Sequence, residues 1–145
     1  MISEGGLRKP ERGVIKIDDP KFWDEDDLDK ELRRQFDVCH SCRRCFNLCD
    51  SFPKLFDLID EAPSMELDTV QSSSFKDVTD ACTLCDMCFM VSCPYVPPHE
   101  FAIDIPSIFI RAKALENKRK KNVIDAQIAK TDFNGKLGVF FTVTA

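Results

Sequence analysis

The chain has 145 residues, of which 43% are hydrophobic and 31% charged, and its formal net charge is -5. This length and composition indicate a single globular domain with a modest core. The acidic balance argues against nucleic acid as a partner, because such binding needs a basic surface. No apolar run is long enough for a secretory signal or a membrane span.

The N-terminal part of the chain predicts an extended segment followed by a helix. Residues 1–20 are polar and are interrupted by proline and glycine, which favours irregular structure. Leu28, Leu32 and Phe36 then recur at every fourth residue, as on one face of a helix. The acidic residues 24–27 precede this face and suit the positive end of a helix dipole.

Further helices are predicted along the rest of the chain. The apolar run 55–59 indicates a short helix, and residues 75–81 indicate a further helical turn. A long helix is expected from Pro106 onward, because proline suits a first helical turn and Ile108 and Leu115 share one side. The fold class is therefore expected to be mainly α.

The chain is predicted to have three parts. An extended N-terminal segment covers residues 1–20, an α-helical domain covers 21–122, and a C-terminal segment covers 123–145. The last residues are apolar and β-branched and have no polar cap. We therefore expect 123–145 to be the truncated start of a further domain.

Eight cysteines form the only internal repeat of the sequence. Without an export signal, clustered cysteines more often bind metal than form disulfides. Their spacing is C-x2-C-x2-C-x3-C in the first motif and C-x2-C-x2-C-x4-C-P in the second. The first motif holds Cys39, Cys42, Cys45 and Cys49, and the second holds Cys82, Cys85, Cys88 and Cys93.

This spacing predicts two [4Fe-4S] clusters. Three thiolates at intervals of three residues let one loop wrap three irons of a cubane, and in two-cluster ferredoxins the fourth ligand comes from the other motif. One cluster is then expected on Cys39, Cys42, Cys45 and Cys93, and the other on Cys82, Cys85, Cys88 and Cys49. Each motif is incomplete alone, so the domain should fold only when it is loaded. No catalytic residue is predicted.

A zinc site is the main alternative that the cysteines leave open. Zinc sites usually take two pairs of cysteines and have no use for a third cysteine three residues after a pair. The spacing therefore favours clusters. A zinc-stabilised structural or interaction module without redox activity is the alternative function.

Residues between and beside the cysteines predict the surroundings of the clusters. Apolar side chains are expected to form a dry shell, with ordinary core packing as the alternative. They are Phe46, Leu48, Leu84, Met87, Phe89 and Met90. Arg43 and Arg44 would favour a more reduced cluster, or else be solvated or paired with carboxylates. The basic run 111–121 is expected to be a solvated helix end, with docking to an acidic partner or an anionic membrane as the alternative.

At these motifs the chain resembles a known family of iron-sulfur proteins. The family is related to the electron-transfer component of heterodisulfide reductase and to the iron-sulfur component of anaerobic glycerol-3-phosphate dehydrogenase, and the likeness is to its N-terminal ferredoxin domain only. Beyond the cysteines, it rests on Phe52-Pro53, on Tyr95-Val-Pro-Pro-His99 and on Arg111-Ala-Lys113. It covers roughly residues 1 to 130.

The resemblance implies an α-helical ferredoxin-like domain with two cluster-binding loops. Two departures limit it. The first motif continues into Asp50 where a generic ferredoxin motif has proline, and relatives continue into cysteine-rich C-terminal domains that this sequence lacks.

The expected function is electron transfer between redox partners of an oxidoreductase complex, as a protein or subunit that is not itself the catalyst. The implied partner is a flavoprotein or another oxidoreductase subunit. We expect a cytoplasmic location without a membrane span, and peripheral association with the inner membrane is left open.

Overall fold

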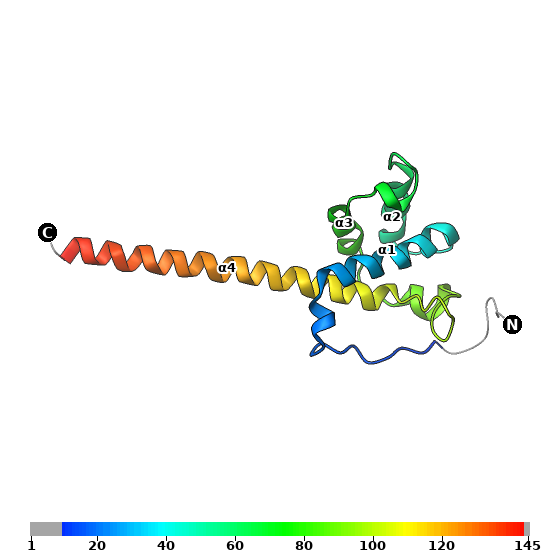
Figure 1. The fold of residues 1–145 in the computed structure, drawn as a ribbon, viewed down its shortest axis with the longest axis horizontal. Helices are drawn as coiled ribbons and strands as arrows, with labels where there is room; N and C mark the ends of the chain where they lie inside the picture. Colours follow the sequence, from blue (N-terminus) through cyan, green and yellow to red (C-terminus); the bar gives the residue numbers. More distant parts are fainter. Residues whose placement is uncertain (1–9, 144–145) are drawn as a thin grey trace. The chain divides into compact units, whose positions relative to one another are not determined.

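The structure is a computed structural model that describes residues 10–143, with side chains through residue 126. The described residues contain helices and no β-strand, which confirms the predicted mainly α fold class. In chain order the elements are η1 (Pro20–Trp23), α1 (Glu25–Cys42), α2 (Ser51–Asp60), η2 (Leu67–Thr69), η3 (Ser72–Ser74), α3 (Phe75–Asp80), the π-helical turn η4 (Cys88–Ser92) and α4 (Ile105–Val143). Figure 1 shows their order along the chain.

Helix α1 forms where the spacing of apolar residues predicts it. The Asp24 side chain caps the helix by accepting hydrogen bonds from two backbone N–H groups of the first turn, at 3.0 and 3.1 Å. Leu28, Leu32 and Phe36 are all buried. The helix therefore presents one apolar face to the core and ends inside the first cysteine motif.

Phe36 lies in the core that α1 forms with the other helices. Its side chain has no exposed surface, and its ring makes edge contacts with Phe75 of α3 and Phe109 of α4, at 5.1 and 5.9 Å between ring centroids. Burial of each such side chain contributes about 1.5–3 kcal/mol. The predicted helices at 55–59 and 75–81 are confirmed as α2 and α3.

A buried hydrogen bond fixes α2 against α3 close to the cysteines. The Ser51 hydroxyl donates to the Val78 carbonyl oxygen at 2.8 Å. Ser51 begins α2 two residues after Cys49, and Val78 lies in α3 four residues before Cys82. This bond therefore links the end of the first motif to the start of the second.

Arg12 and Arg111 connect the N-terminal segment to other parts of residues 1–113 through hydrogen bonds and ion pairs. Arg12 forms ion pairs with Asp86 at 2.7 Å and with Asp104 at 2.6 Å, and its guanidinium lies 4.0 Å from the centre of the Phe89 ring. The Glu11 backbone N–H donates to the Pro97 carbonyl at 3.0 Å. The described part of the extended segment is thus held in place by side-chain and backbone contacts.

Arg111 is the second of these arginines, and its place corrects one prediction. It donates to the carbonyls of Phe22 and Asp24, both at 2.7 Å, and pairs with Asp27 at 2.8 Å. Its side chain is only 13% exposed. The prediction that the basic run is solvated is therefore wrong for Arg111, because carbonyls at the start of α1 bind it.

The chain divides into two compact units, residues 1–113 and 114–145. Within the second unit the basic residues 118–121 are exposed, and Lys120 pairs with Glu116 at 2.9 Å. None of the described helices combines the length and hydropathy needed to cross a lipid bilayer. The predictions for segments 1–20 and 123–145 lie partly outside the described residues.

Candidate functional site

The first cysteine motif begins in the last turn of α1 and ends just before α2. Cys39 and Cys42 lie in the helix, which is closed by a hydrogen bond of 2.8 Å from the Arg43 N–H to the Cys39 carbonyl. Arg43 has a φ of 49°, in the left-handed region. This reversal turns the chain so that Cys45 follows in a tight loop and Cys49 comes directly before α2.

The second motif is mostly irregular backbone between α3 and the π-helical turn η4. Leu84 and Asp86 have φ values of 58° and 65°, which non-glycine residues rarely adopt and which cost about 1–3 kcal/mol each. The Cys93 N–H donates to the Cys88 carbonyl at 2.8 Å and closes the loop. Such strained positions cluster at binding sites, where the surrounding structure imposes them.

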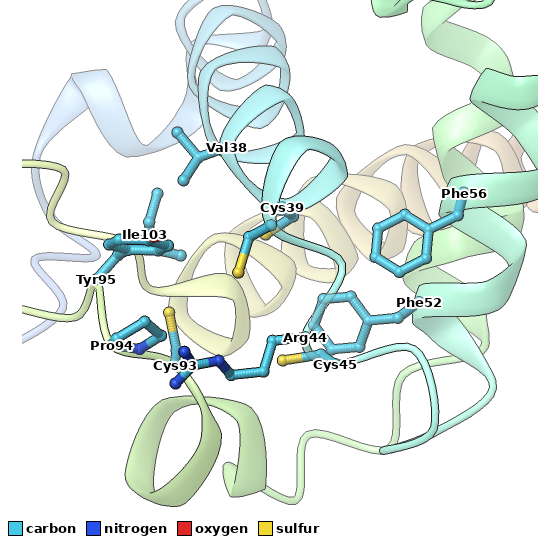
Figure 2. Close-up of a pocket in the computed structure, with 11 residues that line it drawn as sticks. Val38, Cys39, Arg44, Cys45, Phe52, Phe56, Cys93, Pro94, Tyr95 and Ile103 are labelled. Carbon is cyan, nitrogen blue, oxygen red and sulfur yellow. The ribbon is translucent and has the colours of Figure 1, made fainter. Parts of the chain in front are cut away.

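One cavity is lined by cysteines from both motifs. The cysteines are Cys39, Cys42, Cys45 and Cys93. Figure 2 shows three of their sulfurs around one space, Phe52 and Phe56 of α2 on one side and Tyr95 and Ile103 on the other. We call this space the first cavity. Apart from the cysteines and Arg44, its lining is apolar or aromatic.

A second cavity is lined by the remaining cysteine of the first motif and by three cysteines of the second. Its cysteines are Cys49, Cys82, Cys85 and Cys88. Ile105, Pro106 and Phe109 of α4 line its inner wall, and Asp86 also borders it. Cys85 is exposed, whereas the other cysteines are all half-buried.

The two cavities divide the eight cysteines into two sets of four. Cys93 lies with the first motif and Cys49 with the second, which is the grouping that crossed ligation predicts. Phe52 is the one residue that lines both cavities, and it is 4% exposed. All eight cysteines are free thiols in the structure, and their binding of iron stays a prediction.

Burial and crowding make Cys39, Cys88 and Cys93 poor acids in the absence of metal. Burial raises the pKa of the Cys39 thiol well above its usual value, with further contributions from neighbouring cysteines of the same cavity. It raises the pKa of Cys88 to about 12 and that of Cys93 to about 11. Metal ligation needs thiolates, so binding must displace protons from these groups.

The two adjacent arginines of the first motif have different environments. Arg43 bonds the Asp60 carboxylate, with one contact of 2.8 Å, and lies 5.3 Å from the centre of the Phe56 ring. Arg44 instead lines the first cavity. Of the two roles that the sequence leaves open, Arg43 takes the carboxylate-paired one.

The predicted dry shell is wrong for most of its members. Phe89 is buried at 3% exposure, but Phe46, Met87 and Met90 are 47%, 46% and 53% exposed, and Leu84 is 37% exposed. Leu48 is the one predicted member that lines a cavity, and the rest of the apolar enclosure comes from Val38 of α1, from α2 and α4, and from residues 94–103. Helical periodicity gives no signal for exposure in irregular loops, so the sequence did not separate these residues.

Sequence reasoning also missed Arg12. Its carboxylate partners lie 74 and 92 residues away along the chain, and no local pattern points to either contact. Asp86 borders the second cavity, and Arg12 lowers the pKa of its carboxyl group. Arg12 therefore neutralises the negative charge of a carboxylate inside the second motif.

The donor set bears on which metal fits. Among the described residues, no group of three or more His, Cys, Asp or Glu side chains is gathered closely enough to hold a single ion. Zinc holds its thiolates at about 2.3 Å, whereas each thiolate of a cubane binds a different iron and stands further from the others. Four thiols are the donor type of an iron-sulfur cluster and also of some zinc sites, so the choice between the two metals stays a prediction from the spacing of the cysteines.

Comparison of the chain with family models, curated proteins and solved structures finds no match. The resemblance to iron-sulfur subunits thus stays a prediction from the sequence.

Proposed function

We propose that this chain is an electron-transfer protein or subunit that holds two [4Fe-4S] clusters. The observation that carries the proposal is the division of the eight cysteines into two cavities, each with three cysteines of one motif and one of the other. This is the arrangement that two-cluster ferredoxins use. Ligation of every iron by cysteine leaves no open position for a substrate.

The residues of the chain have three tasks in this function. The cysteines supply thiolates from loops whose shape is set by left-handed positions such as Leu84 and Asp86. Phe52, Phe56 and Ile103 restrict water at the first cavity. Phe52 lines both cavities and so keeps them adjacent. When bound, the clusters supply one-electron exchange.

The wider setting of the protein follows from the resemblance. We propose that the domain is of the α-helical ferredoxin type and belongs with the dicluster proteins described above. Its partners would be a flavoprotein or another oxidoreductase subunit. The setting would be cytoplasmic, with peripheral attachment to the inner membrane through such a partner.

Anaerobic purification with iron, sulfide and zinc analysis tests the proposal. Two cubanes require about eight irons and about eight sulfides per chain, and the dithionite-reduced protein should give an EPR signal of two interacting clusters. Stoichiometric zinc, with no broad visible absorption and no reduced signal, would instead establish the zinc-stabilised module.

A further inference from the structure

The two cavities differ in the charges that border them. The first cavity is lined by Arg44 and by no carboxylate among the described residues. The second is bordered by Asp86, whose charge Arg12 offsets at 2.7 Å, and Lys113 stands near Cys82 of this site but does not line its cavity. The first cavity therefore has an uncompensated positive charge beside its cysteines.

Arg44 is free to act on this cavity. It has no hydrogen-bond or ion-pair partner within the described part of the chain, whereas the adjacent Arg43 is held by Asp60. In Figure 2 its side chain extends from the loop of the first motif toward Cys93.

We propose that Arg44 raises the reduction potential of the cluster site formed by Cys39, Cys42, Cys45 and Cys93, so that this site accepts an electron before the other. The inference rests on the proposed function. The step takes one electron from a low-potential donor, forms or breaks no bond and moves no proton. It adds one negative charge beside Arg44, and opposite charges attract across the cavity.

The size of the effect follows from the position of Arg44. Its side chain is exposed, so water and salt weaken the interaction. We expect removal of the charge to lower the equilibrium constant for one-electron reduction by about fivefold, which corresponds to about 40 mV. The shift should become smaller as ionic strength rises.

A matched pair of variants tests the inference in the full chain loaded with iron. Arg44→Gln removes the charge that borders the cavity, and Arg43→Gln removes the neighbouring charge that Asp60 already pairs. Arg44→Lys keeps the charge. Each protein is titrated with dithionite at controlled potential while EPR follows the two clusters, after iron analysis has shown equal loading.

We expect Arg44→Gln to lower the higher of the two midpoint potentials and to move the other less, while Arg43→Gln and Arg44→Lys leave both near the wild-type values. The inference is overturned if Arg44→Gln moves neither potential, moves chiefly the lower one, or moves them no more than Arg43→Gln does. Loaded clusters with unshifted potentials would leave the proposed function intact. A wild-type chain without iron would overturn both.

Discussion

The two cysteine cavities are built by different means. The first is enclosed by apolar side chains of α2 and of residues 94–103, and burial shapes the chemistry of Cys39. The second opens toward solvent at Cys85, and its motif is held by the ion pairs of Arg12. Both sites thus have walls of buried core residues, and the second differs by its exposed cysteine and by polar contacts that span much of the chain.

The largest effect is expected where the two cavities meet. Phe52→Ala should lower the free energy of unfolding by about 3–5 kcal/mol, because it leaves a void in the core, and should reduce iron retention at both sites. Anaerobic urea unfolding followed by circular dichroism, with iron analysis, measures both. Phe52→Leu leaves a smaller void than Phe52→Ala and should lower the free energy of unfolding by less. Loss of iron from only one site would show that Phe52 is not a shared wall.

The second site should release its iron first. Because Cys85 is exposed, whereas all four cysteines of the first cavity are half-buried, a water-soluble iron chelator should remove about four irons in a fast phase and about four in a slow phase from two cubanes. The absorbance of the iron–chelator complex follows both phases. Cys85→Ser should abolish the fast phase and keep the slow one. A single phase in the wild type would remove the distinction between the cavities.

Loss of Arg12 should weaken the second site more than the first. Arg12→Ala removes charge-assisted hydrogen bonds to Asp86 and Asp104, which should cost about 1–2 kcal/mol of stability at this partly exposed position. It should also speed the fast phase of iron release. Arg12→Lys keeps the charge without the bidentate contacts. Its stability and its rate of iron release should lie between those of the wild type and of Arg12→Ala. Equal acceleration of both phases would contradict the local role of Arg12.

The smallest effects are expected from the exposed apolar side chains of the second motif. Met87→Ser and Met90→Ser should change stability by less than about 0.5 kcal/mol, since both side chains are already about half exposed. Phe89→Ala changes the buried residue between them and should lower the free energy of unfolding by about 3–5 kcal/mol. Urea unfolding compares the three variants. A large loss of stability in either methionine variant would show that this side chain is buried, as the predicted dry shell requires.

The positions of the helices could be predicted from local patterns of apolar residues and proline. Leu28, Leu32 and Phe36 occupy one helix face. An apolar run marks α2, and Pro106 marks the first turn of α4. The grouping of the cysteines was also predictable, because two-cluster ferredoxins with this spacing take the fourth ligand of each cluster from the other motif.

The features that distinguish the two cavities were not predictable from the sequence. Arg43 and Arg44 are adjacent and chemically identical, and only the left-handed turn at Arg43 sends one to Asp60 and the other to the cavity. The contact of Arg12 with Asp86 joins two irregular segments, where no periodic pattern exists. Side-chain direction in such loops is set by tertiary contacts.

Iron content in two double variants tests the crossed arrangement most directly. Cys42→Ser with Cys93→Ser changes two cysteines of one cavity, whereas Cys42→Ser with Cys49→Ser changes two of one motif but of different cavities. Circular dichroism of each variant, with Cys42→Ser alone as the control, checks that helices are retained. We predict about four irons per chain in the first double variant, as in the control, and almost none in the second, because one intact cubane survives only in the first. The reverse result, with iron kept when Cys42 and Cys49 are changed together, would contradict the crossed ligation of the two clusters.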